Sequence, residues 1–319
     1  MADEYNIQSM TDSGNAVLSS SLADYRKTLV DNAYNDIPVL RILNQAGRKR
    51  TINGGTSIVE HLLTGKQEDG GFYSGATGLN TSQTDHTMLC EYRWQNVYEP
   101  IQITRDEERQ NSGDAHKLLD LVGTKIQTAE MGIKDRIGEA LVTSVAGAGN
   151  LIDLSTLVNT GTLGTVAGGT YTFWQATSTT SGAFATQGLT DMQTLYYALS
   201  SSSILENPTH VLTTSTVFQK YEQTRLPLER LSNTTTGTAG FTNLTFKGVP
   251  IIYDQYVDSG TMYMCNTNYW NLAVDSETDF VTTPFISPTN QTVKVAFILW
   301  RGNQTTNNRR RFGKLTSIS

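Results

Sequence analysis

The sequence predicts an α+β fold, in which a long helix and a long hairpin are followed by a region where helical and strand-like patterns interleave. One long helical pattern covers 114–146, where apolar residues recur at every third or fourth position. Two strand-like stretches within 51–104 flank a Gly-rich segment, which indicates a hairpin with a long tip. Something extended is expected to lie along the helix, because at about 1.5 Å per residue it is longer than a compact small domain is wide.

Size and composition restrict the class of protein. The chain has 319 residues, enough for one elaborated domain or two, and a net charge of −6. An acidic chain is not expected to be a general nucleic-acid binder, although it can still carry local basic patches. Cys90 and Cys265 lie far apart in the sequence, which argues against a disulfide framework and favours a reducing compartment. The polar N-terminus and the lack of a long apolar run predict a soluble chain with no export signal and no membrane span.

Residues 1–50 are expected to form an arm that depends on a neighbour for its order. Residues 1–20 are rich in Ser, Asn and Asp and contain few large apolar groups. Apolar residues over 22–43 predict a short helix, a break at Pro38 and a second turn. The basic triplet that follows is interpreted as a solvated turn, with phosphate or inter-subunit contact as the alternative: Arg48, Lys49 and Arg50.

The hairpin over 51–104 is unusual for the length of its tip. Strands are predicted at 56–63 and 86–103, with clear alternation of apolar and polar residues in the second. The segment between them has too little apolar material for a core and is longer than most loops in compact domains. It is therefore either disordered or folded against something outside the chain, and we favour the second interpretation. Its charged and aromatic residues include Lys66, Glu68, Asp69, Phe72 and Tyr73.

The long helix over 114–146 has one apolar face and is interrupted by glycines. Asp114 suits a cap at its start. Gly123, Gly132 and Gly138 each cost about 1 kcal/mol relative to Ala, which is expected where another backbone packs closely or the helix bends. Two shorter helices broken near Gly132 are the alternative. The apolar face consists of Leu118, Val122, Ile126, Ala129, Ile133, Ile137 and Leu141.

The region after the long helix is predicted to be a mixed α/β unit. Residues 154–190 carry no Asp, Glu, Lys or Arg and are interpreted as irregular strands and loops packed locally. Thr190 and Gln193 match a capping box, which predicts a helix. A second helix is predicted at 215–224, ending before Pro227. Strands are predicted at 209–213, 246–253, 261–265 and 270–274.

The C-terminal part is predicted to be a hairpin. It would consist of a long strand at 292–301, a polar loop at 302–308 and a returning strand at 309–318. The long strand is expected to run beside the long helix, which makes 151–283 an insertion into the first domain. This architecture requires that the helix face the sheet containing 293–299 through Val122, Ile126, Ile133 and Ile137.

No residue pattern predicts a catalytic, cofactor or metal site. The motifs of phosphate-binding loops, dinucleotide folds, zinc proteases and serine hydrolases are missing. The four histidines are scattered through different elements without ligand spacing. The acidic residues at 106–108 are interpreted as a charged surface turn rather than an acid–base pair. The chain is therefore expected not to be an enzyme. The basic run either meets phosphates or acidic partners or ends a strand as solvated residues: Arg309, Arg310 and Arg311.

The order of these parts carries a resemblance. Local stretches at 246–251 (FKGVPI), 262–267 (MYMCNT) and 309–315 (RRRFGKL) add to it. Together they resemble the major capsid proteins of tailed bacteriophages, which have the Hong Kong 97-like fold. The resemblance implies an N-arm at 1–50, an extended loop at 51–104, a peripheral domain with the spine helix and an antiparallel sheet from 105–150 and 284–319, and an inserted axial domain at 151–283.

The resemblance also implies a function. Many copies would self-assemble through hexamers and pentamers into an icosahedral shell that encloses double-stranded DNA, contacted on the inner face without sequence preference. Scaffolding, portal and decoration proteins would be further partners, and the chain would be a virion component assembled in the host cytoplasm. An encapsulin-like nanocompartment shell is the main alternative, and a soluble hydrolase or a tail-tube subunit is more remote.

The resemblance also implies which residues contact other subunits, according to the element in which each residue lies. Some capsid proteins of this family join a Lys of the extended loop to an Asn by an isopeptide bond, and here Lys66 with Asn303, Asn307 or Asn308 would be the candidates. The implied contact residues are Lys66, Glu68, Asp69, Phe72 and Tyr73 in the extended loop, Arg301, Asn303, Asn307, Asn308, Arg309, Arg310 and Arg311 in the C-terminal loop and basic run, and Arg48, Lys49 and Arg50 at the base of the arm.

Overall fold

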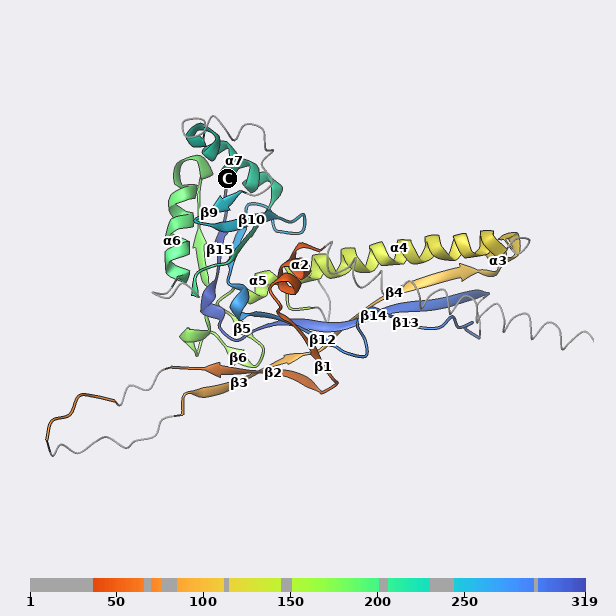
Figure 1. Cartoon of the computed structure of the whole chain (residues 1–319), viewed down its shortest axis with the longest axis horizontal. Coiled ribbons are helices and arrows are strands. Elements are labelled where there is room, and N and C mark those ends of the chain that lie inside the picture. The colour runs from red at the N-terminus through yellow and green to blue at the C-terminus, as the bar shows by residue number, and fades with distance from the viewer. Residues whose placement is uncertain are drawn as a thin grey trace, which may run out of the picture.

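The body of the molecule is elongated, with a long helix and long strands at one end and a projecting hairpin at the other (Figure 1). Among the described residues, no helix has the length and apolar character needed to cross a membrane. The predicted helix at the start of 22–43, the cap at Asp114 and the tip residues Lys66, Glu68 and Asp69 lie outside those residues. The computed structural model describes residues 37–65, 70–75, 85–111, 115–144, 151–200, 206–229, 244–289 and 292–319.

A five-stranded sheet runs along the body, and its central strand is β14 (Val293–Thr306). Along its first part β14 pairs antiparallel with β4 (Gln95–Thr104), and at its far end it pairs antiparallel with β12 (Trp270–Asp275). The sheet is completed by β13 (Val281–Thr282) beside β14 and by β1 (Lys49–Ile52), which runs parallel to β12.

The long helix forms as one element, α4 (Ala115–Val142), preceded by α3 (Arg105–Asn111). Its apolar face packs into the same core as Ile101 and Ile103 of β4 and Ala296 and Ile298 of β14, which confirms the expected contact with the sheet. The buried residues of this face are Val122, Ile126, Ala129, Ile133, Ile137 and Leu141.

Two of the helix glycines have close neighbours, but these are side chains rather than sheet backbone. A Cβ placed on Gly132 would lie 3.2 Å from the carboxyl group of Glu99 on β4. At Gly138 it would lie 3.0 Å from the ring of Tyr256. Gly138 therefore lets a loop of the second region pack against α4, which ties the two parts of the molecule together.

The C-terminal hairpin was predicted wrongly. The polar stretch 302–308 is not a loop over most of its length, because β14 continues through it to Thr306 and pairs with β12. The returning strand β15 (Phe312–Thr316) does not pair with β14 but joins a different sheet. The chain thus crosses from one sheet to the other at the short 3-10 turn η5 (Arg309–Arg311).

The second sheet has six strands in the order β7-β15-β11-β8-β10-β9. Its residues alternate between two cores. Tyr263 and Cys265 of β11 (Met262–Cys265) face the main core shared with α4, whereas Met262 and Met264 face a second core under α6 (Leu189–Leu199) and α7 (Ser215–Glu229). The remaining strands are β7 (Thr177–Thr180), β8 (His210–Thr213), β9 (Thr245–Phe246) and β10 (Val249–Tyr253).

Two details of the helices here differ from prediction. The capping box at Thr190 does not form, because α6 already begins at Leu189 and is preceded by a π-helical turn, η2 (Phe184–Gly188). The α7 helix includes Pro227 instead of ending before it. The strand pair at 246–253 is present as β9 and β10, joined at Lys247 and Gly248, both with positive φ.

The projecting hairpin consists of β2 (Ser57–Leu63) and β3 (Thr87–Arg93), which pair antiparallel as predicted. The predicted second strand is divided at Trp94, so that β3 belongs to the hairpin and β4 to the main sheet. The smaller elements are α2 (Pro38–Gln45), α5 (Leu154–Leu157), β5 (Thr162–Leu163), β6 (Val166–Ala167), and the 3-10 turns η1 (Thr172–Trp174) and η4 (Thr267–Tyr269).

Candidate assembly surfaces

The β2–β3 hairpin has one face packed on the body and one face open. The inward face carries Ile58 and Leu62 of β2 and Tyr92 of β3, all of them buried. The outward face carries Leu63 and Leu89, which are 78% and 52% exposed. A two-stranded ribbon is marginally stable on its own, so the open apolar face suits burial against another surface.

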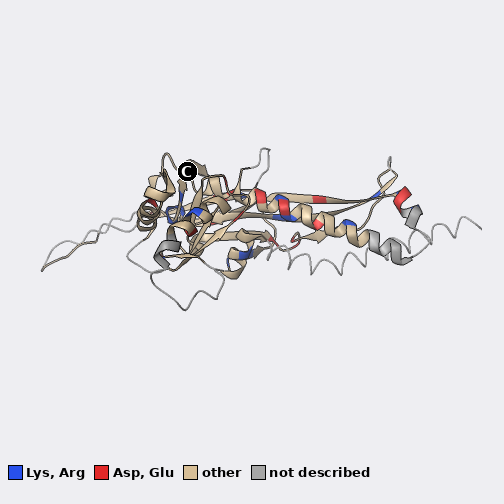
Figure 2. Ribbon diagram, turned by 90° about the horizontal axis from the view of Figure 1, so that it is seen from above, with Lys and Arg blue, Asp and Glu red and all other residues tan. Residues whose placement is uncertain are grey.

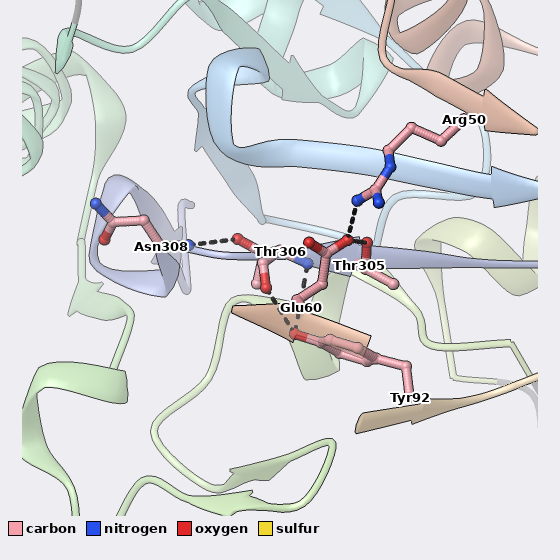
Figure 3. A network of polar contacts seen from close by, with 6 residues as sticks. All are labelled: Arg50, Glu60, Tyr92, Thr305, Thr306 and Asn308. Atoms are coloured by element: carbon pink, nitrogen blue, oxygen red, sulfur yellow. Dashed lines mark hydrogen bonds and ion pairs between the residues drawn. The ribbon is translucent and has the colours of Figure 1, made fainter. Parts of the chain in front are cut away.

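A polar network fixes the base of this hairpin to β14 (Figure 3). The Glu60 carboxylate is buried on the inward face, lies 2.6 Å from the Arg50 guanidinium and accepts a hydrogen bond of 2.9 Å from the Thr305 hydroxyl. The Tyr92 hydroxyl donates to the Thr306 carbonyl at 2.8 Å, and burial raises the pKa of Tyr92. The direction in which the hairpin projects is therefore set by buried polar contacts.

The sequence interpretation missed this network. Glu60 lies on the buried face of β2, between Ile58 and Leu62. A charged residue among the apolar residues of that face indicates a buried polar partner, and this could have been noticed in the sequence. Its partner Thr305 could not be inferred, because it was assigned to a solvated loop.

The tip of the hairpin presents aromatic side chains to solvent. Phe72 is fully exposed and Tyr73 is 69% exposed. Figure 1 shows the hairpin projecting from the body, away from both sheets. The body, as far as the structure describes it, therefore leaves these two aromatic side chains exposed.

The C-terminal candidate residues differ widely in exposure. Asn303 is buried, accepts a hydrogen bond from the Ile152 backbone at 3.0 Å and donates one to the Arg93 carbonyl at 2.8 Å. Burial of Asn303 contradicts its assignment to a loop that contacts other subunits. It also excludes Asn303 as the partner of Lys66 in an isopeptide bond. Arg301 is half-buried, lies 3.3 Å from the Asp275 carboxylate and stacks over the ring of Trp94.

Arg309 is an internal structural residue, which contradicts its assignment to a solvated or contacting basic run. Its side chain is fully buried. The guanidinium donates to four backbone carbonyls, and burial lowers the pKa of Arg309 to about 10, so it stays protonated at neutral pH. The acceptors are the carbonyls of Thr156, Leu157, Gly161 and Trp174.

The neighbours of Arg309 lie nearer the surface. Arg310 is exposed, and Arg311 donates to the Leu199 carbonyl at 2.9 Å and pairs with Glu206. Both line a cavity of about 650 Å³ that also includes Leu63, the last residue of β2 before the tip, together with Asn307 and Asn308. The structure thus brings four of the predicted C-terminal residues together beside the extended hairpin.

The basic triplet was also predicted wrongly, since Lys49 and Arg50 begin β1, directly after Arg48, rather than forming a turn. Arg48 donates to the Asn268 side chain at 2.8 Å, Lys49 lies 2.6 Å from the Asp279 carboxylate, and Arg50 pairs with Glu60. The charges of Lys49 and Arg50 are therefore paired within the chain, whereas Arg48 contacts a neutral amide. Figure 2 shows basic and acidic residues interspersed along the body.

The described residues contain no group of three or more His, Cys, Asp or Glu side chains placed to hold a metal ion. Cys90 and Cys265 are both free and buried. Burial raises the pKa of both thiols, so neither is activated as a nucleophile.

Comparison with known proteins relates this architecture to shell proteins. No family model and no curated protein matches the sequence. The capsid of cyanophage A-1(L) is 14% identical with a TM-score of 0.62, covering 88% of this chain and 93% of that one. The capsid of a native GTA particle is 12% identical with a TM-score of 0.60, covering 87% and 90%. The holo-SrpI encapsulin of Synechococcus elongatus PCC 7942 is 12% identical with a TM-score of 0.52, covering 88% of each chain. The chain therefore has the fold of phage capsid proteins, which this encapsulin shares.

Proposed function

We propose that this chain is the major capsid protein of a tailed bacteriophage, and that its copies assemble through hexamers and pentamers into an icosahedral shell around double-stranded DNA. The observation that carries the proposal is the likeness to the cyanophage capsid, which extends over 88% of this chain and 93% of that one. A likeness over this much of both chains is not limited to one widespread sheet motif.

The surface chemistry supports the same proposal. Leu63, Leu89 and Phe72 are exposed apolar residues on a projecting ribbon, and burial of such residues contributes about 1.5–3 kcal/mol each. A ribbon repeated in every copy gains this burial only when copies meet. The extended hairpin would then lie over a neighbouring subunit, and residues 1–36 would brace another.

The remaining candidate contacts belong to the same proposal. Asn307, Asn308 and Arg310 lie on the rim of the cavity beside the hairpin and would meet other subunits there. DNA would be held on the inner face by scattered basic residues without sequence preference. Scaffolding, portal and decoration proteins would be further partners, and assembly would take place in the host cytoplasm.

A second candidate is an encapsulin-like shell that holds protein cargo instead of a genome. The observation that favours it is the likeness to the SrpI encapsulin, at a TM-score of 0.52. The lower TM-score, against 0.62 for the cyanophage capsid, ranks it second.

The contents of purified particles distinguish a phage capsid from an encapsulin-like shell. The chain is expressed in its phage or prophage context, the particles are treated with nuclease, and protected nucleic acid is extracted and sized. The proposal predicts closed shells with protected double-stranded DNA, and shells that contain protein cargo but no DNA would favour the encapsulin. A chain that stays monomeric and turns over a hydrolase substrate would contradict both.

A further inference from the structure

The chain contains a single Asn-Gly pair, Asn53-Gly54. The side-chain amide of Asn is chemically labile, because the backbone nitrogen of the next residue can attack it. A following glycine hinders this attack least, since it has no Cβ. The pair lies in the connection 53–56, between the end of β1 and the start of β2. Figure 1 shows this connection at the end of the hairpin that joins the body, opposite the tip.

The connection is anchored at both ends but belongs to no strand or helix itself. On one side, Ile52 is paired with Asp275 of β12, and its carbonyl accepts a hydrogen bond of 3.1 Å from the Ser276 N–H. On the other side, Ser57 is paired with Arg93 of β3. The backbone between these two points is therefore not held in a sheet, so its nitrogen atoms are not committed to strand pairing.

The two reacting groups are accessible. Asn53 and Gly54 are both exposed, and neither the Asn53 side chain nor the Gly54 N–H has a hydrogen-bond partner among the described residues. A Cβ placed on Gly54 would meet no atom within 4 Å, so the space around the pair is open. Gly54 and Gly55 have φ values of +65° and +100°, and two successive glycines let the connection rearrange at little steric cost.

We propose that Asn53 is a site of spontaneous covalent modification, in which the Gly54 backbone nitrogen closes a succinimide ring on the Asn53 side chain and water reopens the ring. Ring closure forms a bond between the Gly54 nitrogen and Asn53 Cγ. The proton of that nitrogen passes to solvent, and the side-chain amide leaves as ammonia. Water then cleaves one of the two bonds between the ring nitrogen and a carbonyl carbon. Cleavage at Cγ gives aspartate, and cleavage at the main-chain carbonyl gives isoaspartate.

The modification changes the root of the hairpin in two ways. Each event replaces a neutral amide by a carboxylate, which adds a negative charge to a chain whose net charge is −6. Isoaspartate also lengthens the main chain by one methylene group in the connection. The contacts from Glu60 to Arg50 and from Tyr92 to Thr306 still hold the hairpin beyond this point. The fraction of modified copies therefore rises with time since synthesis, whether or not the copies assemble.

Mass spectrometry of the purified full chain tests the proposal. The chain is incubated at mildly alkaline pH in water enriched in heavy oxygen and is then digested with trypsin in ordinary water. Trypsin releases the peptide 51–66, in which Asn53 is the only side-chain amide. The proposal predicts that a growing fraction of this peptide becomes an acid that carries one heavy oxygen atom. Part of that fraction should be a substrate for an isoaspartate methyltransferase.

Three controls separate the effect of the structure from that of the sequence. The same tryptic peptide, incubated alone, gives the rate without the fold, and the folded chain is expected to react at a rate of the same order. Asn53→Gln keeps an amide but would have to close a larger ring, so the mass shift should be lost. Asn44 is also exposed but lies within α2 and precedes Gln45, and it should remain an amide.

Three outcomes would overturn the proposal. A free peptide that reacts while the folded chain keeps its amide would show that the fold protects Asn53. A mass shift without isoaspartate would contradict the succinimide route, because hydrolysis of the side chain alone gives only aspartate. Conversion of Asn44 at the same rate as Asn53 would show general hydrolysis instead of a site set by the Asn-Gly connection.

Discussion

Replacement of Arg309 by Met is expected to destabilise the subunit strongly, although Arg309 lies in a run of three basic residues that suggested a solvated strand end. Arg309 is fully buried and satisfies four backbone carbonyls in α5, in η1 and in the segment that joins them. Met is close in length and apolar, so the Arg309→Met variant fills much of the space but supplies no donor.

The size of the effect follows from those four carbonyls. With about 1 kcal/mol for each acceptor left without a donor, Arg309→Met is expected to lower the free energy of unfolding by about 4 kcal/mol. Removal of the buried charge relieves part of its desolvation cost, which places the expected loss at about 3–4 kcal/mol. The Arg309→Lys variant keeps the charge but not the fork of donors, and should fall between Arg309→Met and wild type.

Urea unfolding of the unassembled subunit, followed by tryptophan fluorescence, measures this effect. Trp174 is a suitable reporter because it is buried and its own carbonyl accepts from Arg309. Arg310→Met is the matched control, since Arg310 is exposed, and it should lie within about 0.5 kcal/mol of wild type. If Arg309→Met were as stable as Arg310→Met, the assignment of Arg309 as an internal structural residue would be refuted.

Three further substitutions test other parts of the structure. Tyr92→Phe removes the hydrogen bond of 2.8 Å to the β14 backbone and should lower the free energy of unfolding by about 1 kcal/mol, measured by urea unfolding. Ile133→Ala, in the buried face of α4, should cost about 2–5 kcal/mol, whereas Met131→Ala on the exposed face of the same helix should cost less than about 0.5 kcal/mol; equal losses would contradict the orientation of α4. The Glu107 pKa is lowered to about 2 by a backbone N–H at the end of β4 and by Lys125, so its stabilising effect is complete above the ordinary value of 4.5 and is lost as the pH falls toward 2. Glu107→Gln should therefore make unfolding less sensitive to pH in this window, and an NMR titration that found an ordinary pKa for Glu107 would contradict the contact.

The long helix and the extended hairpin were predictable because their patterns are local. The apolar spacing of α4 depends only on residues three or four apart, and its predicted face is the buried one. The alternation in β2 and β3 likewise identifies which residues point inward.

The C-terminal region was not predictable in the same way, because its polar residues are satisfied by distant partners. Gln304 is buried, donates to the Leu141 carbonyl at 2.8 Å and accepts from the Trp270 indole at 2.9 Å. Thr305 bonds to Glu60, 245 positions away. A run of Asn, Gln and Thr with neighbouring Gly is typical of a loop, and only the tertiary structure shows that it is the end of a buried strand.

Distant partners also explain why the sequence identified only some of the candidate contact residues correctly. Arg309, Arg310 and Arg311 are chemically identical in the sequence, yet one is internal, one exposed and one paired with Glu206. The exposure of Phe72 at the hairpin tip was predictable, because nothing nearby in the sequence could bury it. The cavity beside the hairpin was not, because residues that line it lie as far apart in the chain as His61 and Arg311.

The central claim, that copies of this chain join into a closed shell, is tested most directly by size-exclusion chromatography with electron microscopy of the purified chain. The account predicts that protein in the void volume forms closed, uniform shells built of rings. A chain that elutes as a monomer at every concentration and in the presence of its phage partners, or that forms open tubes, would contradict it.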